Sequence, residues 1–316
     1  MANSTIIRNL TFVAAIGLSV TTPALGQQSQ VKNISVVAYN VHLLPKVALK
    51  FAGKRSNSEY RAQAIAAQLA QHEIVGISEA FDKTYSRTLI NELQKQSKSG
   101  LLMVKGPGRT GRHLIGSGLL LFSRFPALET HTTTYDHASR FLTSGLKADG
   151  FAAKGALHVR LQLDESSGAS VDCFLTHLES HSEEARGDQI RQFARFVTEH
   201  ADDSVPRILL GDFNIEADPA DSESQYCKLL GLLTDANRTV VDAGQAIATG
   251  PVGTSEATVD GGGRRIDYIL LSQKQATSSV RLDLLRTQHL RLLDENVEEG
   301  SLSDHSAVRI VLRADW

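Results

Sequence analysis

The stretch Arg207-Ile-Leu-Leu-Gly-Asp-Phe-Asn214 joins an apolar run to two polar side chains. Its apolar residues predict a buried β-strand. Because side chains alternate between the two faces of a strand, Asp212 and Asn214 fall on one face while Phe213 turns inward between them. A carboxylate and an amide that converge at the end of a strand are candidates for catalysis or metal binding.

Similar apolar, β-rich runs recur along the chain. They cover residues 34–41, 74–78, 118–123, 155–163, 171–176, 207–210, 266–271 and 307–312. Many of them exceed simple alternation, which predicts strands that are covered on both faces.

Helical patterns lie between these runs. The clearest occupy residues 58–71, behind a Ser/Asn cap, and 182–200, and weaker ones occupy 82–94 and 222–230. Strands both alternate with helices and follow one another directly, as in 118–163, which favours a layered α/β sandwich over a doubly wound sheet. Since there is no internal repeat, linker or break in composition, we expect one domain.

The composition is that of an ordinary folded protein. The chain has 316 residues, with 33 Lys+Arg, 35 Asp+Glu and a formal charge of -2. A chain of this length buries roughly three quarters of its unfolded surface, so it needs no disulfide lattice or structural metal to fold. The balanced charge excludes disordered, collagen-like and histone-like proteins, and it disfavours a high-affinity, non-specific nucleic-acid binder.

The N-terminal 26 residues have the pattern of a secretory signal peptide. Arg8 precedes an apolar run from Leu10 to Val20, and Pro23-Ala-Leu-Gly26 supplies small residues before a cut near Gln27. The apolar run is far shorter than the roughly 20 residues that a membrane span needs. We therefore expect residues 1–26 to be removed and residues 27–316 to form a single catalytic domain, exported to the periplasm or secreted.

Export makes the two cysteines relevant, because that compartment permits disulfides. Cys173 lies in a strand-like run and Cys227 in a predicted helix. They could form a bridge, or they could be two buried thiols that behave as small hydrophobic side chains.

Polar residues gather at the carboxyl ends of the apolar runs, where several strands can present side chains at one rim. Six separate elements each supply a carboxylate, an amide or an imidazole there: Asn40, Glu79, His177, Asp212 with Asn214, Asp267, and Asp304 with His305. The chain has no Gly-x-Ser-x-Gly elbow, no phosphate-binding Walker loop and no Cys/His zinc spacing. Carboxylates and amides suit Mg²⁺, so the set predicts metal-assisted hydrolysis of a phosphate ester.

The order of these motifs resembles that of the endonuclease/exonuclease/phosphatase superfamily, whose fold is similar to that of deoxyribonuclease I. The resemblance spans about residues 34–312 and rests on six ordered motifs: Tyr39-Asn40, Ser78-Glu79, Thr176-His177, Gly211-Asp212-Phe-Asn214, Ile266-Asp267-Tyr268 and Ser303-Asp304-His305. It implies an α/β fold, a four-layer α/β/β/α sandwich with two packed mixed β-sheets.

Three further motifs look most like those of the secreted neutral sphingomyelinases, which are phospholipases C. They are Tyr39-Asn-Val-His-Leu-Leu-Pro45, Glu79-Ala-Phe-Asp82 and Lys154-Gly155. This part of the resemblance implies hydrolysis of sphingomyelin or a related choline phospholipid to ceramide or diglyceride and phosphocholine.

The resemblance also implies a role for each motif. Glu79 would be the principal ligand of Mg²⁺, with Asn40 beside it, and Mn²⁺ or Co²⁺ could substitute in a site of one or two ions. His305 would be the general base, because imidazole titrates near neutral pH. Either Asp267 or Asp304 would orient its ring.

The remaining site residues would act on the phosphoryl group and on water. Asn214 and His177 would donate hydrogen bonds to the phosphoryl oxygens. Asp212 would position the nucleophilic water or help to protonate the leaving alkoxide. Lys154 is a candidate for contact with the phosphate.

Recognition of the choline group would require aromatic faces, which attract quaternary ammonium groups. The candidates are Phe81, Tyr85, Phe141 and Phe151, each of which could instead be a core residue. The loop of residues 43–51 is both apolar and basic, which suits contact with a bilayer surface or packing as a short helix. We therefore expect a phospholipid membrane surface as the partner, no stable nucleic-acid partner, and a monomer.

The main alternative is a secreted nuclease of the same superfamily, since the chemistry is shared and only substrate-facing residues differ. Basic clusters at Arg109, Arg112 and His113 and at Arg264-Arg265 would serve successive DNA phosphates. A phosphoinositide phosphatase and a non-catalytic binding protein are further alternatives, and the complete set of polar motifs disfavours the second of these.

Overall fold

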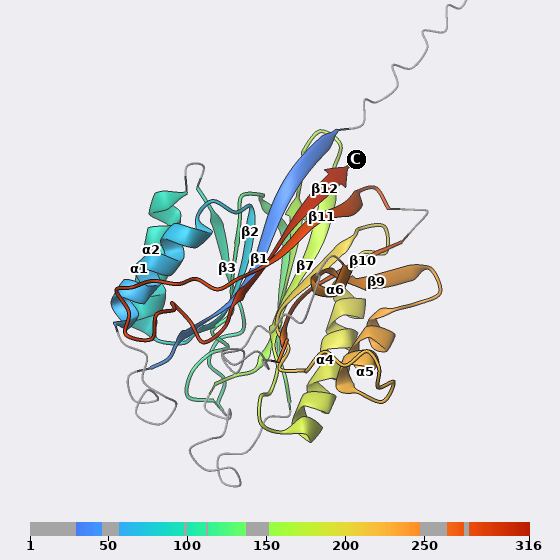
Figure 1. Cartoon of the computed structure of the whole chain (residues 1–316). Helices are drawn as coiled ribbons and strands as arrows, with labels where there is room; N and C mark the ends of the chain where they lie inside the picture. The colour runs from blue at the N-terminus through green and yellow to red at the C-terminus, as the bar shows by residue number, and fades with distance from the viewer. Residues whose placement is uncertain are drawn as a thin grey trace, which may run out of the picture.

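Two six-stranded β-sheets form the centre of the molecule (Figure 1). The structure is a computed structural model that describes residues 30–45, 57–97, 100–111, 113–136, 152–246, 264–274 and 278–316. The expected signal peptide, Phe141, Phe151 and Arg112 lie outside the described residues. The strands of the first sheet run in the order β11 (Arg281–Leu290), β12 (Ala307–Asp315), β1 (Val31–Leu43), β2 (Ile74–Ala80), β4 (Leu120–Ser123), β3 (Leu102–Lys105).

The second sheet is built in the same way. Its strands run in the order β5 (Ala127–Thr134), β6 (Gly155–Gln162), β7 (Ser170–His177), β8 (Arg207–Asp212), β10 (Asp267–Lys274), β9 (Arg238–Asp242). Each sheet contains one parallel pair, β1 with β2 and β7 with β8, and its other pairs are antiparallel. Both sheets are therefore mixed.

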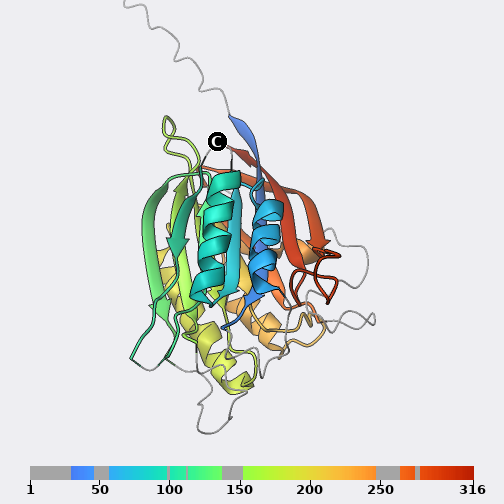
Figure 2. The same cartoon turned by 90° about the vertical axis from the view of Figure 1, so that its left-hand side faces the viewer.

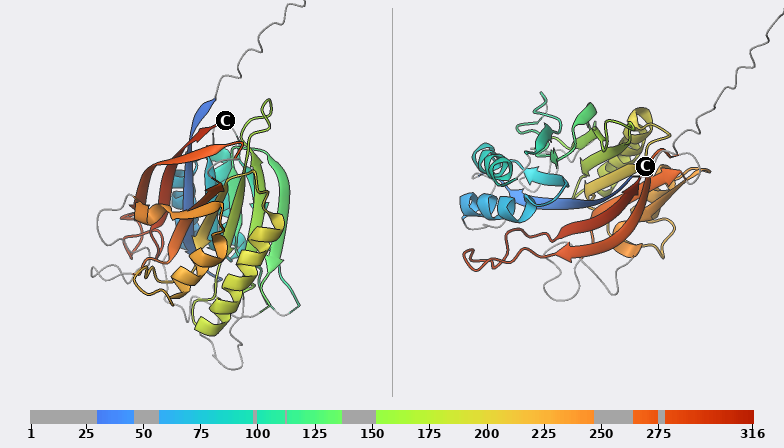
Figure 3. Two further views of the ribbon diagram at one scale, coloured as in Figure 1. Left: turned by 90° about the vertical axis from the view of Figure 1, so that its right-hand side faces the viewer. Right: turned by 90° about the horizontal axis from the view of Figure 1, so that it is seen from above.

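Helices cover the outer face of each sheet. Helices α1 (Ser58–Leu69) and α2 (Lys83–Gln96) lie on the first sheet, as Figure 2 shows. Helices α4 (Glu183–His200) and α5 (Gln225–Leu233) lie on the second, as the left view of Figure 3 shows, and a short α6 (Ala243–Ala246) follows β9. The expected α/β/β/α sandwich is confirmed.

Three hydrophobic cores hold these layers together, one between the sheets and one under each pair of helices. Along β1, Val36 and Ala38 face the other sheet while Val37 and Tyr39 face the helices, as the alternation of side chains along a strand requires. The sheets approach closely at Gly76 of β2, because a Cβ there would lie 2.6 Å from a methyl group of Leu210 on β8. A larger residue at Gly76 would push the two sheets apart.

The sequence predicted the eight interior strands and missed the four edge strands, β3, β5, β9 and β11. Edge strands are paired on one side only. In β5, β9 and β11 polar residues interrupt the apolar ones, so these strands lack the continuous apolar run by which the others were recognised, whereas β3 has a short run from Leu102 to Val104. β5, for example, alternates between half-buried and exposed positions from Ala127 to Thr133.

The four longer helices lie where the sequence predicted them, with ends that differ by a few residues. Asp82, Ser182 and Ser224 cap α2, α4 and α5 by accepting backbone hydrogen bonds. The cap expected before α1 is wrong, because Asn57 adopts a left-handed conformation and its side chain makes no capping bond. Cys173 and Cys227 are both free thiols, the first buried in β7 and the second half-buried in α5, so the possible bridge is absent from the structure.

Strand register brings the polar residues to one edge of the sandwich. In the parallel pairs, Asn40 lies opposite Ser78, and His177 lies opposite Asp212. In the antiparallel pair of β8 and β10, Asp267 also lies opposite Asp212. The ends of both sheets therefore meet at the same place.

Candidate active site

Asp212, the last residue of β8, is the centre of the polar cluster. Its side chain is almost completely buried, and its Oδ2 lies 3.6 Å from Nε2 of His177 and 3.8 Å from Nε2 of His305. The same oxygen accepts a hydrogen bond of 2.9 Å from Nδ2 of Asn40 on β1. This bond joins the two sheets inside the site. Burial, followed by the negative charge of Asp267, raises the pKa of Asp212 above its ordinary value.

His305 is held by Asp267 rather than by its sequence neighbour Asp304. Its Nδ1 lies 2.7 Å from Oδ2 of Asp267, and both side chains are buried. This contact fixes the proton on Nδ1 and leaves Nε2 directed toward Asp212. Burial by itself would lower the pKa of His305, but the charge and hydrogen bond of Asp267, together with the charges of Asp212 and Asp304, raise that pKa well above 6.5.

Asp304 lies on the other side of the cluster. Its Oδ2 is 3.6 Å from Nε2 of His42, and its Oδ1 accepts a hydrogen bond from Ser303. Its charge is also the second-largest influence on Glu79, after burial, and together they raise the pKa of Glu79 to about 7. Asp304 therefore acts on Glu79. Of the two residues expected to orient the ring of His305, Asp267 is the one in contact with it.

Glu79 occupies the end of β2 in a strained conformation. Its φ of 60° is in the left-handed region, its side chain is 17% exposed, and its Oε1 lies 3.8 Å from Nε2 of His177. Of the four non-glycine residues with positive φ among the described residues, three are Glu79, His42 and Asn214, all in or beside the site. Such conformations cost on the order of 1–3 kcal/mol each and concentrate at functional sites.

Lys154 places a buried cation in the middle of these carboxylates. It precedes β6, is 2% exposed, and donates a hydrogen bond of 2.8 Å from Nζ to Nε2 of His177. Nε2 of His177 is therefore an acceptor in this arrangement, and the donor at that point is the ammonium group. The positive charge of Lys154 also acts to lower the pKa of Glu79.

Asn214 and Asn40 already have partners within the site. Asn214 donates its Nδ2 to the carbonyl of Leu178 and its backbone N–H to Oδ1 of Asp212. An amide nitrogen has two hydrogens, so Asn214 can donate one more bond. Asn40 accepts the backbone N–H of His42 on its Oδ1, and its amide lies with Asp212 rather than with Glu79, the partner the sequence suggested.

Two groups of side chains within the described residues have the composition and spacing of metal ligands. They are Glu79, His177 and Asp212, and Asp212, Asp267 and His305, with one ligand atom of each residue within 4.8 Å of the others. Since Nε2 of His177 is bonded to Lys154 and Nδ1 of His305 to Asp267, the oxygen atoms are the better candidates. Oxygen ligands are those that Mg²⁺ prefers.

The aromatic candidates separate into one near the site and one away from it. The Phe81 ring lies 6.4 Å from the His177 ring, centroid to centroid. Tyr85 instead packs against the core between α1, α2 and the first sheet. Of the two aromatic candidates within the described residues, Phe81 is therefore the one that lies at the polar cluster.

Two residues that position the site escaped sequence reasoning. Arg61 of α1 is fully buried and donates to the carbonyl oxygens of Val41, His42 and Leu302, so that it ties the end of β1 to the segment before His305. Ser303 donates its Oγ to the carbonyl of Asn40 at 2.6 Å. An arginine in a predicted helix is normally expected to be solvent-exposed, and nothing in the sequence distinguishes Arg61 from an exposed arginine.

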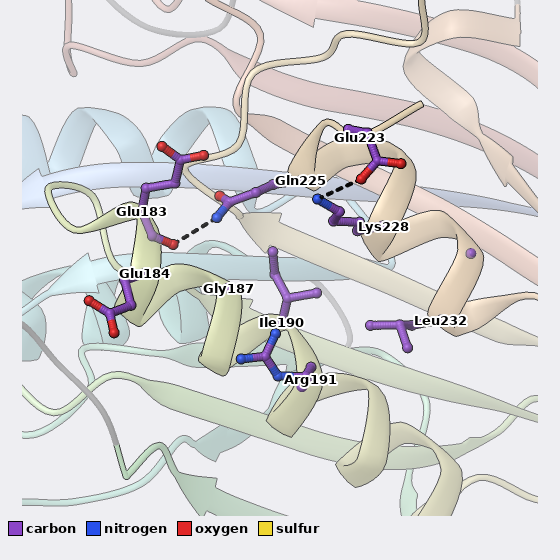
Figure 4. Close-up of a pocket in the computed structure, with 10 residues that line it drawn as sticks. Glu183, Glu184, Gly187, Ile190, Arg191, Glu223, Gln225, Lys228 and Leu232 are labelled. Carbon is purple, nitrogen blue, oxygen red and sulfur yellow. Dashed lines mark hydrogen bonds and ion pairs between the residues drawn. The ribbon is translucent and has the colours of Figure 1, made fainter. Parts of the chain in front are cut away.

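A hollow of about 950 Å³ lies away from this site, between α4 and α5 (Figure 4). Its lining mixes acidic and basic side chains, some of which bind one another, as Lys228 binds Glu223. None of the candidate catalytic residues lines it. We therefore place the chemistry at the strand ends and not in this hollow.

The fold and the site together define a hydrolase of phosphate esters. Residues 37–305 match the Endonuclease/Exonuclease/phosphatase family, and the chain belongs to this family. No curated protein sequence is similar enough to match.

Solved structures share the fold at low sequence identity. A mutant of beta toxin from Staphylococcus aureus with bound magnesium ions has a TM-score of 0.61 at 18% identity and covers 88% of this chain and 99% of its own. Sphingomyelinase C from Streptomyces griseocarneus has a TM-score of 0.59 at 18% identity, over 89% and 99%. An endonuclease/exonuclease/phosphatase from Bacteroides vulgatus has a TM-score of 0.60 at 20% identity, over 89% and 98%. These likenesses show the fold.

No helix among the described residues is both long and apolar enough to cross a bilayer.

Proposed function

We propose that this protein is an exported, Mg²⁺-dependent phosphodiesterase of the phospholipase C type. It hydrolyses sphingomyelin or a related choline phospholipid to ceramide or diglyceride and phosphocholine, and it acts as a monomer at a phospholipid surface. The observation that carries the phosphodiesterase part is the position of His305, held by Asp267 at Nδ1 with Nε2 facing Asp212.

The carboxylates of the site fit a divalent cation. Burial and the negative charge of Asp304 raise the pKa of Glu79 to about 7 although Lys154 and His305 act to lower it, so a bound cation would stabilise the ionised form further. Glu79 and Asp212, whose oxygen atoms lie within 4.8 Å of each other, would hold Mg²⁺, or Mn²⁺ or Co²⁺ in its place, as one or two ions. The ion would withdraw charge from the phosphoryl oxygens and stabilise the leaving oxygen.

His305 serves as the general base. Its Nε2 accepts a proton from the attacking water, while Asp267 keeps the other proton on Nδ1 and stabilises the imidazolium that forms. Asp212, which faces the same Nε2, orients the attacking water. The leaving alkoxide takes a proton from solvent, and the imidazolium of His305 releases its proton to solvent, so that the site returns to its starting state. The reaction needs no covalent intermediate.

Lys154 and Asn214 stabilise the charge that gathers on the phosphoryl oxygens. Lys154 is buried, so its ammonium is a stronger donor than it would be in water. His177 accepts one of its hydrogens and so aims the others. Asn214 contributes the amide hydrogen that Leu178 does not use.

Two exposed leucines support action at a lipid surface. Leu114 is 63% exposed and Leu293 is 70% exposed. The loop of Leu114 pairs with Ala152, close to Lys154, and the loop of Leu293 leads into Ser303. Most of the basic and apolar segment expected to touch the bilayer, residues 46–51, lies outside the described residues.

The choice of a choline lipid over DNA is supported by the surroundings of the site. Phe81 offers an aromatic face beside His177. Arg265, one of the cations that a nuclease would direct at DNA, is instead bound to Asp242 at 2.7 Å and stacked on Tyr268.

The test is to incubate the purified protein with Mg²⁺ and, in parallel, with sphingomyelin, phosphatidylcholine and plasmid DNA. We expect phosphocholine to be released from lipid and the plasmid to stay supercoiled. Nicked plasmid with intact lipid would overturn the assignment of a lipid substrate and show that the protein is a nuclease. The His305→Ala protein is the control, and its hydrolysis of lipid at the normal rate would refute the mechanism.

A further inference from the structure

A groove of about 500 Å³ opens directly beside the end of β2, which carries Glu79. Its wall includes Ala80, which follows Glu79 in the chain, and Phe81, whose ring also faces His177. The ring packs on the backbone of Gly118, where φ is +65° and a Cβ would lie 2.6 Å from the ring. The ring of Phe81 therefore lies between the groove and His177 of the catalytic site.

The floor of the groove is aliphatic. Ile90 of α2, Met103 of β3 and Leu120 of β4 line it between the helix and the edge of the first sheet. Ile90 and Met103 remain partly exposed there, although both pack against the core beneath. Such a surface favours an apolar ligand.

The rim of the groove is basic. Lys83 and Arg87, one turn apart on α2, and Lys105, at the end of β3, are all exposed. None of the three has a hydrogen-bond or ion-pair partner among the described residues, and no acidic side chain lines this groove in the described part of the chain. By contrast, Lys95, farther along α2, is paired with Glu92.

We propose that this groove binds an anionic phospholipid that lies next to the substrate in the bilayer. Its phosphate is placed among Lys83, Arg87 and Lys105, and its first methylene groups contact the aliphatic floor. An apolar floor under three free cations matches an amphipathic anion. A nucleic acid would instead require stacking or polar surfaces for its bases, and among the described residues Phe81 is the one aromatic side chain in the lining.

This inference rests on the proposed function, because it places the catalytic opening against a lipid surface. It assigns the groove a role in holding the enzyme there, separate from recognition of the scissile ester. Each basic residue near an anionic surface contributes about fivefold to binding, so the three together contribute about 100-fold.

The experiment measures binding to phosphatidylcholine vesicles with 0 or 20 mol% phosphatidic acid, by co-sedimentation in EDTA so that no lipid is hydrolysed. The full-length protein should bind the anionic vesicles far more tightly than the neutral ones. The variant Lys83→Gln/Arg87→Gln/Lys105→Gln should lose roughly 100-fold in affinity for the anionic vesicles. All three positions are exposed, so the fold should be unaffected.

The matched control is Lys95→Gln/Lys228→Gln/Arg281→Gln, which removes the same charge from exposed sites elsewhere. It should retain most of the affinity of the unmodified protein, and equal losses in the two triple variants would overturn the proposal. Dihexanoyl phosphatidic acid should compete for the groove more strongly than glycerol 3-phosphate. Equal competition would refute the part played by the aliphatic floor.

A 20-base-pair DNA duplex is tested in the same variants. If the groove variant loses affinity for DNA while its vesicle binding is unchanged, the occupant is a nucleic acid and the proposal is wrong. Because vesicle binding is measured without turnover, its failure is distinct from failure of the proposed activity. If the protein binds anionic vesicles through the rim but leaves sphingomyelin intact, the groove proposal holds and the proposed substrate is wrong.

Discussion

Replacing Asp267 by Asn tests how the site prepares His305 for proton transfer. The substitution keeps the shape of the side chain and removes its charge, which lies 2.7 Å from Nδ1 of His305 in a buried environment. A hydrogen bond to a charged group contributes about 1.5–3 kcal/mol, and one pKa unit corresponds to about 1.4 kcal/mol. We therefore expect the pKa of His305 to fall in the variant, because the charge and hydrogen bond of Asp267 are the largest influences that raise it.

The lower pKa would not by itself restore activity to the variant. An Asn amide can donate to Nδ1, which moves the ring proton to Nε2 and removes the lone pair that must accept the proton of water. General base catalysis contributes about 10²–10⁴-fold, so kcat should fall by at least about 100-fold across the whole pH range.

The assay is hydrolysis of the soluble diester bis(p-nitrophenyl) phosphate as a function of pH, with Mg²⁺ in excess. His305 must be neutral to act as a base, so activity rises as the pH passes above its pKa. Asp267→Asn should shift this acidic limb to lower pH as well as lowering the plateau, and Asp267→Glu should recover part of the plateau. A variant with kcat within threefold of the original and an unmoved acidic limb would refute this reasoning.

Three further predictions follow from other contacts. Glu79→Gln should weaken Mg²⁺ binding in calorimetry and lower kcat at least about 100-fold, and EDTA should abolish activity reversibly; tight Mg²⁺ binding by the variant would remove Glu79 from the metal site. Lys154→Met keeps the length of the side chain but not its charge, so kcat should fall about 10²–10³-fold with a smaller change in KM, and a loss confined to KM would show that Lys154 only binds the ground state. His72 is buried, and desolvation lowers its pKa to about 4 from 6.5. Below pH 6.5 the unfolded chain takes up a proton that the folded state resists, so stability is lost as the pH falls from 6.5 toward 4. Between pH 7.5 and 5.0 the protein should lose about 2 kcal/mol more stability to urea unfolding than His72→Gln does, and equal losses would contradict the assignment.

The edge strands show where sequence reasoning stopped. The interior strands are recognisable because their apolar runs are buried on both faces, as in β7, where every residue is buried. In strands β5 and β11 polar residues interrupt the apolar ones, so their pairing depends on the neighbouring strand rather than on their own composition. Their existence could be found only once β6 and β12 were in place.

The sequence by itself determined the layered fold and the set of polar residues at the strand ends, because both follow from local patterns along the chain. The tertiary structure decided which of these residues act on one another. Asp304 is adjacent to His305 in the sequence, yet Asp267, 38 residues away, holds the imidazole. Likewise Lys154 and His177 meet because β6 pairs with β7 so that Gly155 lies opposite His177. Register between strands is set by the packing of the whole sandwich, and a one-residue shift would separate these pairs.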